Sequence, residues 1–377
     1  MTESDRKSGP YPYYGANGLQ GYIDEYIFDE PLVLLAEDGG HFGKPDRGIA
    51  YRISGKSWVN NHAHVLRARQ GVDLAYLCRA LENYDVSPFV SGTTRAKLTK
   101  GSAAKIPVPL PPLEQQKRIA AILGQADDLR RKRRLAIEKL KNLPQAIFRE
   151  MFNPLIARGD RGFFKPLKEL TSKIGSGATP TGGESAYLTE GITLIRSMNV
   201  RDGYFAYEGL AFLSQEQAAK LDIVAVEGKD VLINITGASV ARVCRVPSSV
   251  LPARVNQHVS IIRATEDITP EFLEAFLLIP ESKDRLVNIA QSGATRQAIT
   301  KSALENFEVL VAPRAMQEGF AQRTAAAMKL KARYSESLTA LDSLFASLQY
   351  HAFTGTLAPS SAEAMLAPLQ RNNVASV

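Results

Sequence analysis

The amino-acid sequence predicts an α+β protein built from two copies of one unit, each with a mixed part followed by a long helix. Three observations predict this class: a repeat at fixed spacing, a proline-to-helix junction that occurs twice, and an apolar heptad pattern after each junction. The chain has 377 residues, 45% of them hydrophobic, which is enough for two or more domains with their own cores.

The repeat covers strand, loop and helix. Residues 59–68 align with residues 255–264, a separation of 196 residues. Residues 91–95 match residues 292–296, and from there the separation is 201 residues as far as Phe152 and Phe353. A separation that stays constant over so long a stretch indicates a duplicated unit.

Each unit opens with short β-type runs, such as residues 31–35 and 230–235, separated by Gly, Asn and Asp. Short helices are expected near Leu74–Leu81 and Pro270–Leu278. The long helices begin directly after Pro112 and Pro313, because proline suits the first turn, where its missing N–H has no helical partner.

Apolar residues recur in both helices at alternating steps of three and four, the pattern of a helix-pairing seam. The predicted seam consists of Ile119, Ile122, Ala126, Leu129, Ala136, Leu140, Leu143 and Ile147 in the first helix, and Phe320, Arg323, Ala327, Leu330, Tyr334, Ser337, Leu341, Leu344 and Leu348 in the second. Arg133 interrupts the first seam, and Pro144 is expected to kink or loosen that helix. Two helices of about 35 residues, roughly 50 Å long, most economically pack on each other. The alternative, that each packs only on its own domain, explains the apolar stripe but not the duplication.

The predicted boundaries are a first mixed domain over residues 1–112, a first helix over 113–153, a second mixed domain over 164–313, a second helix over 314–357, and a tail over 358–377 that is expected to be disordered. Only 58 residues precede Val59, whereas 91 residues, 164–254, precede Val255. The first domain therefore has no counterpart of residues 167–180. Either it is a shorter subtype, or the start of the gene is lost or misplaced.

Composition limits the class of protein. The net charge of +7 and the pI near 9.2 favour a polyanionic partner, although an ordinary basic protein explains them equally well. Cys78 and Cys244 lie far apart without metal-ligand spacing, which argues against a disulfide framework or a zinc site and fits a reducing cytosol. No apolar run approaches the ~20 residues of a membrane span, and the N-terminus has no signal-peptide core. A cytoplasmic location is expected.

The junction at residues 111–119, the Gly-rich start at residues 175–180 and the Tyr-Tyr-Gly-Ala-Asn-Gly run at residues 13–18 resemble the DNA specificity subunit of type I restriction–modification systems. The resemblance extends from about Tyr11 to Leu357. It implies two target-recognition domains in tandem repeat, each followed by a long helix, with the two helices pairing as an antiparallel coiled coil that holds the domains apart along double-stranded DNA.

The resemblance also implies partners. These are two methyltransferase subunits, which use S-adenosylmethionine to methylate adenine N6, and ATP-dependent restriction subunits. S-adenosylmethionine, ATP and Mg are thus expected in the partner subunits, and no cofactor is expected on this chain. Each domain would specify one half of a split, asymmetric site.

Catalytic motifs are absent from the sequence. Residues 153–155, Asn-Pro-Leu, lack the second proline and the aromatic residue of an adenine methyltransferase loop, and no Gly-Lys-Ser/Thr follows the Gly-rich stretch. The five histidines form no ligand cluster. No catalytic or metal-binding residue is therefore predicted. Two alternatives stay open: a truncated or silent specificity copy, and a DNA-modifying enzyme in its own right.

Candidate contacts to DNA are the polar positions shared by the two units: Asn60, Asn61, His62, Thr94, Arg95, Lys97, Lys100, Asn256, Gln257, His258, Thr295, Arg296 and Lys301. The alternative is that the Asn/His segments bond neighbouring backbone and the Ser-Gly loops only position the next strand. The residues expected to pair the helices and hold the partner subunits are Ile119, Leu129, Leu140, Leu143, Leu330, Leu341 and Leu344. The basic run at residues 130–134 is expected either to lie over DNA between the half-sites or to face the other helix.

Overall fold

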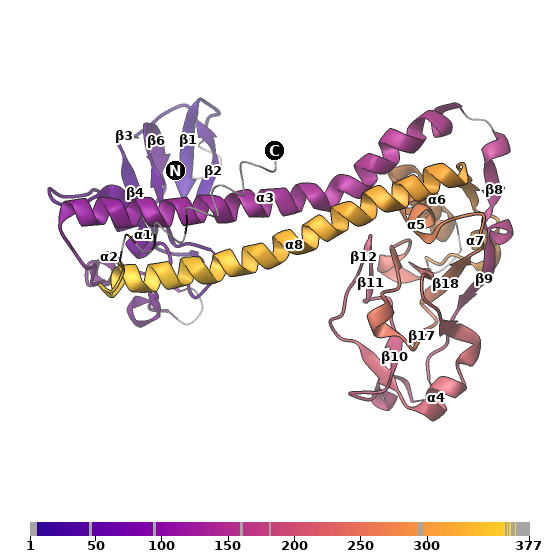
Figure 1. Cartoon of the computed structure of the whole chain (residues 1–377). Coiled ribbons are helices and arrows are strands. Elements are labelled where there is room, and N and C mark those ends of the chain that lie inside the picture. Colours follow the sequence, from indigo (N-terminus) through magenta and orange to yellow (C-terminus); the bar gives the residue numbers. More distant parts are fainter. Residues whose placement is uncertain are drawn as a thin grey trace. The chain divides into compact units, whose positions relative to one another are not determined.

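The structure is a computed structural model, shown in Figure 1, and it describes residues 6–44, 47–92, 96–158, 161–180, 182–292, 297–358, 360, 362 and 366. The chain forms two compact units. The first comprises Met1–Ala136 together with Tyr334–Val377, and the second comprises Ile137–Arg333. Each unit combines a mixed part with one portion of each long helix.

The mixed part of the first unit contains two sheets. One has the order β2-β1-β6-β3 and the other β5-β4-β7, and β1 runs parallel to β6. Strand β4 is buried over its whole length because both of its faces are covered. The elements are β1 (Tyr11–Gly15), β2 (Gly18–Ile23), β3 (Phe28–Asp29), β4 (Leu32–Ala36), β5 (Ala50–Ile53), β6 (Lys56–Val59), β7 (Ala63–Leu66), α1 (Leu74–Leu81), η2 (Ser87–Phe89) and α2 (Lys100–Ala103).

The second unit repeats this plan and extends it. Its sheets have the orders β13-β10-β17-β14, β16-β15-β18-β9, β19-β8 and β11-β12. The strands are β8 (Phe164–Pro166), β9 (Thr171–Ser176), β10 (Ile192–Ile195), β11 (Val200–Arg201), β12 (Tyr204–Phe205), β13 (Ala211–Leu213), β14 (Ala225–Val226), β15 (Val231–Asn234), β16 (Val243–Arg245), β17 (Ala253–Val255), β18 (Val259–Ala264) and β19 (Glu308–Leu310). The short helices are η3 (Arg161–Phe163), η4 (Leu167–Glu169), η5 (Gly183–Ala186), α4 (Gln215–Ala219), η6 (Asp222–Val224), η7 (Gly237–Ser239), η8 (Ser248–Val250), α5 (Pro270–Leu278), α6 (Pro280–Gln291) and α7 (Lys301–Glu305).

The sequence repeat corresponds to a repeat of topology. The parallel pair β1–β6 matches the parallel pair β10–β17, and the three strands β5-β4-β7 match β16-β15-β18. The units differ at one sheet edge: β9 pairs with β18, whereas no strand among the described residues of the first unit pairs with the matching edge of β7. Strand β9 lies within residues 167–180, the segment for which the sequence offers no counterpart.

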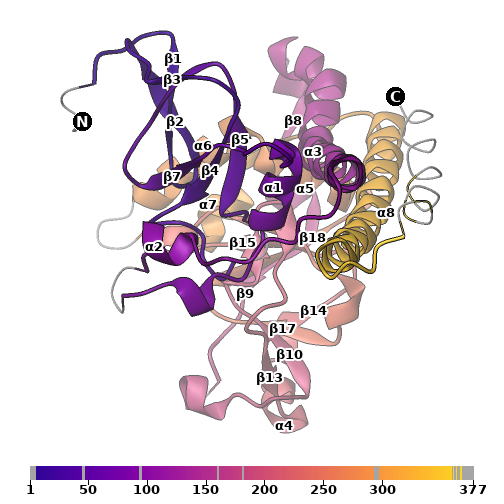
Figure 2. The same cartoon turned by 90° about the vertical axis from the view of Figure 1, so that its left-hand side faces the viewer.

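Helices α3 (Leu113–Arg158) and α8 (Arg314–Phe353) contribute residues to both units. In the first unit the start of α3 packs against the end of α8, where Ile119 and Leu123 share a core with Phe345 and Leu348 (Figures 1 and 2). In the second unit the end of α3 packs against the start of α8, through Phe148 and Phe320. The helices are therefore antiparallel, and the predicted α+β class with helix pairing is confirmed.

The helix bounds differ slightly from the prediction. Helix α3 continues through Pro144 and Pro154 to Arg158, and α8 ends at Phe353. Of the predicted tail over residues 358–377, only 358, 360, 362 and 366 are described, and Ala362 and Leu366 are buried with the helix residues of the first unit.

The seam of α8 differs from the predicted one at Arg323 and Leu330, which are exposed, and at Leu344, which is half-buried beside the buried Phe345. Thr324, Phe345 and Ala352 are buried. Thr324 tolerates burial because its hydroxyl donates to the Phe320 carbonyl inside the helix, at 2.9 Å. Arg323 instead turns outward, where it pairs with Glu150 of α3. Of the other predicted pairing residues, Ile119, Leu129, Leu140 and Leu341 are buried, and Leu143 and Leu344 are half-buried.

One buried glutamine joins each mixed part to its long helix. In the second unit the Gln317 side chain accepts from the N–H of Thr269, at the N-terminus of α5, at 2.8 Å. It also donates to the carbonyls of Asp267 and Ala312, at 3.1 and 2.8 Å. We call Gln317 and its counterpart Gln116 the junction glutamines.

Gln116 makes the same three bonds in the first unit. Its side chain accepts from the Asp73 N–H at 2.9 Å and donates to the carbonyls of Gly71 and Pro111, at 3.0 and 2.8 Å. The abrupt proline-to-helix junction is thus a hydrogen-bonded connection between the first turn of the long helix and a short helix of the mixed part.

Candidate nucleic-acid interface

The most conspicuous repeated polar feature is a three-residue turn in each unit. It joins β6 to β7 in the first unit and β17 to β18 in the second. The side-chain oxygen of Asn60 accepts from the His62 N–H at 2.9 Å, and that of Asn256 accepts from the His258 N–H at 3.1 Å. The two asparagines therefore hold the turn, as short Asn side chains do when they bond backbone two residues on.

The middle residue of each turn, Asn61 or Gln257, is exposed. Asn256, by contrast, is 5% exposed. Its geometry therefore fits the alternative reading, in which the asparagine bonds neighbouring backbone, better than a contact with DNA. We call residues 60–62 and 256–258 the reading turns. Their exposed surface comes from the middle residue and the following histidine.

Each reading turn is tied to the loop that follows the central strand of its sheet. His62 Nδ1 lies 2.6 Å from Asp38 Oδ1, and His258 Nδ1 lies 2.6 Å from Thr236 Oγ1. The backbone repeats the connection, because the Glu37 N–H donates to the His62 carbonyl and the Ile235 N–H to the His258 carbonyl. Asp38 and Thr236 thus occupy equivalent places.

The same loops meet the segments that flank the two Ser-Gly loops. Asp38 forms an isolated bridge with Lys97, and Thr236 forms one with Ala298. The structure therefore brings together, in each unit, the reading turn and the base of the Ser-Gly loop. Thr94, Arg95, Thr295 and Arg296 themselves lie outside the described residues.

The predicted lysines lie apart from the reading turns or are already paired. Lys97 forms an ion pair with Glu37 at 3.0 Å. Lys100 and Lys301 are the exposed first residues of α2 and α7, and Lys301 pairs with Glu305 at 3.6 Å.

The two neighbouring histidines of the first unit do not share one strand face. His62 lies in the turn, and only His64 lies on β7. His64 Nε2 is 2.7 Å from the Leu98 carbonyl oxygen, which fixes the ring within the unit. Among the described residues, no group of three or more His, Cys, Asp or Glu side chains could hold a metal ion.

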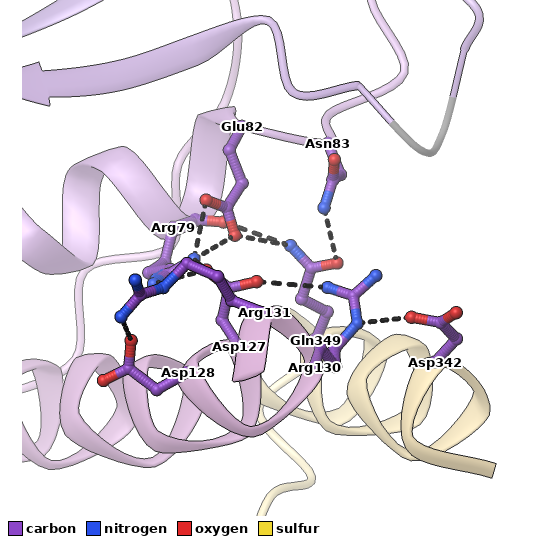
Figure 3. A network of polar contacts seen from close by, with 9 residues as sticks. All are labelled: Arg79, Glu82, Asn83, Asp127, Asp128, Arg130, Arg131, Asp342 and Gln349. Atoms are coloured by element: carbon purple, nitrogen blue, oxygen red, sulfur yellow. Dashed lines mark hydrogen bonds and ion pairs between the residues drawn. The ribbon is translucent and has the colours of Figure 1, made fainter. Parts of the chain in front are cut away.

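Part of the basic run of α3 faces the other helix in the first unit, whereas Arg131 and Lys132 are exposed and Arg131 pairs with Asp128 of its own helix. Arg130 donates to Asp342 of α8 at 2.6 Å and lies over the Phe345 ring, and Arg133 lies over the Tyr334 ring at 4.1 Å. Figure 3 shows Arg130 bonded to Asp342 and Asp127 and close to the cluster formed by Arg79, Glu82 and Gln349. Burial raises the pKa of the Glu82 carboxyl, although Arg79 opposes the shift. Arg130 and Arg133 are thus engaged in helix pairing.

Sequence reasoning missed two features of this region. The partners of the turn histidines, Asp38 and Thr236, come from the loops after β4 and β15, more than 20 residues away in the sequence, so no local pattern marks them. The junction glutamines could have been found from the sequence, because Gln116 and Gln317 are polar residues that recur at the fixed separation, each in the first turn of the helix after the prolines.

Comparison with known proteins gives a consistent result. Residues 1–139 match the family described as the type I restriction modification DNA specificity domain. A provisionally named type I restriction enzyme specificity subunit of Haemophilus influenzae is 42% identical over 123 residues, which is 33% of this chain and 31% of that protein. The EcoprrI specificity subunit of Escherichia coli is 27% identical over 34% of this chain and 31% of its own. The chain thus spans about a third of the length of these two relatives.

Longer but weaker similarity covers most of the chain. The EcoKI specificity subunit of Escherichia coli is 22% identical over 92% of this chain and 82% of that protein. Two solved structures share the fold. The S subunit of a type I restriction–modification system from M. genitalium has a TM-score of 0.57 at 13% identity, covering 94% of this chain and 91% of its own. A second, from a study of complex assembly and conformational transition in a type I system, has a TM-score of 0.53 at 18% identity, covering 93% of each chain.

The family match over residues 1–139, the related sequences and the shared fold all agree with the resemblance to type I restriction–modification DNA specificity subunits that the sequence carries.

Proposed function

We propose that this chain is a non-catalytic, sequence-specific DNA-binding subunit in which each unit specifies one half of a split, asymmetric site. The observation that carries the proposal is the duplication of the reading turn together with its contacts to the loop after β4 or β15. An exposed amide and an imidazole held on a rigid turn can hydrogen-bond base edges in the major groove. Two such turns with different middle residues, Asn61 and Gln257, suit two different half-sites.

The antiparallel pairing of α3 and α8 supports the second part of the proposal. A rigid helical connection would fix the number of unread base pairs between the half-sites, because a helix has a constant rise per residue. The positive net charge of the chain, +7, suits a DNA partner.

The proposed partners are those that the similarity to type I specificity subunits implies. We infer that the chain docks two methyltransferase subunits and the restriction subunits, and that S-adenosylmethionine, ATP and Mg act in those subunits and not on this chain. A cytoplasmic location, with the DNA and the partner subunits, belongs to the same proposal. Among the described residues, no helix is both long and apolar enough to cross a membrane.

The test is co-expression of the full chain with the methyltransferase encoded beside it, followed by mapping of methylated adenines in host DNA. The proposal predicts one bipartite motif with a constant gap, which disappears when this chain is omitted. No new methylation, despite a soluble complex of the two proteins, would favour the silent-copy alternative. Methyl transfer from labelled S-adenosylmethionine by the purified chain alone would instead favour an enzyme.

A further inference from the structure

A cavity of about 440 Å³ lies beside the reading turn of the second unit. Its walls come from the end of β11, from η7 with the residue before it, from the residue before β16 and from the turn itself. The lining residues are Ser197, Met198, Arg201, Thr236, Gly237, Ala238, Ser239, Arg242 and His258, none of which carries a carboxylate.

Two of the lining residues are arginines without a counter-ion. Arg201 and Arg242 are half-buried, and among the residues that the structure describes neither guanidinium has a hydrogen-bond or ion-pair partner. The half-buried arginines elsewhere in this unit do have such partners: Arg245 with Glu274, Arg254 with Asp222 and Arg263 with Asp230. Two guanidiniums that line the same cavity, with neither a counter-ion nor a carboxylate among the described residues of its walls, point to an anion that is bound in the functional state.

The remaining polar groups also suit an anion. The hydroxyls of Thr236 and Ser239 lie in the same walls as the guanidiniums, and hydroxyl and guanidinium groups are the usual donors to the phosphate oxygens of DNA. Gln257 lies next to His258 and is exposed; its side-chain oxygen accepts from the Thr179 hydroxyl and its nitrogen lies 3.0 Å from His258 Nε2, which holds the amide at the surface. Two half-buried arginines close to an exposed amide suit a phosphate contact next to a base contact.

The first unit lacks this arrangement. Ile49 occupies the place of Arg242, since its carbonyl accepts from Ala36 as the Arg242 carbonyl accepts from Asn234. Asp38 occupies the place of Thr236, and its carboxylate would repel a phosphate. The cavity is therefore not a requirement of the repeated fold.

We propose that Arg201 and Arg242, with Thr236 and Ser239, form a binding site for a DNA backbone phosphate that is specific to the second unit. This inference rests on the proposed function, because it assigns the way in which the second unit positions its half-site.

The test compares the full-length wild-type chain with the Arg201→Gln/Arg242→Gln variant, and uses a fluorescent duplex of arbitrary sequence as the probe. Affinity is measured over a range of NaCl concentrations. Loss of two phosphate contacts should lower the slope of log K against log [NaCl] by about two units, because each contact releases roughly one counter-ion. The Lys168→Gln/Lys220→Gln variant removes the same charge from exposed positions of the same unit and should keep the wild-type slope.

Thermal unfolding distinguishes the site from a structural role. Removal of two unpaired, half-buried cations should leave the melting temperature unchanged or raise it. An unchanged slope, or a loss of affinity at constant slope as expected of a base contact, overturns the phosphate site while the proposed function stands. If the wild-type chain fails to bind the duplex at every salt concentration, both the phosphate site and the proposed function are contradicted.

Discussion

The junction glutamines give the sharpest quantitative expectation. Gln317→Met keeps the length and approximate shape of the side chain but removes one acceptor and two donor bonds. Thr269 and Ala312 are 6% and 2% exposed, so the N–H of one and the carbonyl of the other would be left without water. Each unpaired buried group costs about 1–3 kcal/mol, whereas the carbonyl of the exposed Asp267 can bond to solvent. We therefore expect Gln317→Met to lower the free energy of unfolding by about 3 kcal/mol.

Gln116→Met should cost less, about 1 kcal/mol, because its partners Asp73, Gly71 and Pro111 are half-buried or exposed. Urea unfolding measures both changes. Far-UV circular dichroism follows the whole chain, and the fluorescence of Trp58, the only tryptophan, follows the first unit. Hydrogen exchange at the Thr269 amide, which should accelerate in Gln317→Met, reports the lost bond directly.

Two further variants sharpen the test. Gln322→Met, at an exposed position of the same helix, should change stability by no more than about 0.5 kcal/mol. In Gln317→Glu a carboxylate would face two carbonyl oxygens, which raises its folded-state pKa above the unfolded value of about 4.3. Its destabilisation should be small below pH 4.3 and grow as the pH rises above that value. If Gln317→Met were as stable as wild type, the junction would not depend on this side chain.

Three other expectations test separate parts of the structure. Burial raises the pKa of the Cys78 and Cys244 thiols to about 12. Neither thiol should therefore react with a thiol reagent at pH 8 in the folded chain, and both should react in urea. A thiol that reacts fast without denaturant would contradict their burial. Phe345→Ala should lower the free energy of unfolding by about 3 kcal/mol, since Phe345 is 3% exposed and Arg130 lies over its ring. Leu330→Ala, at an exposed position, should lower it by under about 1 kcal/mol. If urea unfolding gave the reverse order, the seam predicted from the sequence would be the correct one. The double variant Leu140→Asp/Leu341→Asp buries charge in both helices at a cost of several kcal/mol, and should abolish co-purification with the methyltransferase subunit. If the double variant still assembled and methylated the same split site, the helices would not space the units.

The architecture could be predicted from the sequence because its signals are local and repeated. The separation of 201 residues carries through the Ser-Gly loop, the prolines and the helix, so one alignment gives the duplication, the junction and the long helices together. The missing counterpart of residues 167–180 was visible in the same alignment, and the structure shows β9 within that segment as an edge strand of the second unit.

The seam could be predicted only in part. Steps of three and four fit two helix stripes that share every second residue, and apolar content does not decide between Leu344 and Phe345. The choice depends on the other helix, where Arg130 lies over the Phe345 ring. In the same way, the role of Asn60 and Asn256 depends on the turn that each closes, and the partners of His62 and His258 come from loops more than 20 residues away in the sequence.

The central claim is that each unit specifies one half of the DNA site. The most direct measurement maps methylated adenines after co-expression of the methyltransferase with two variants of this chain, Asn61→Ala in the first reading turn and Gln257→Ala in the second. Each lost base contact should relax specificity by roughly 1–3 kcal/mol. The account predicts that Asn61→Ala degrades the motif in one half only, that Gln257→Ala degrades it in the other half, and that the gap stays constant in both. If both variants degraded the same half, or if the gap changed, the assignment of one unit to each half-site would be contradicted.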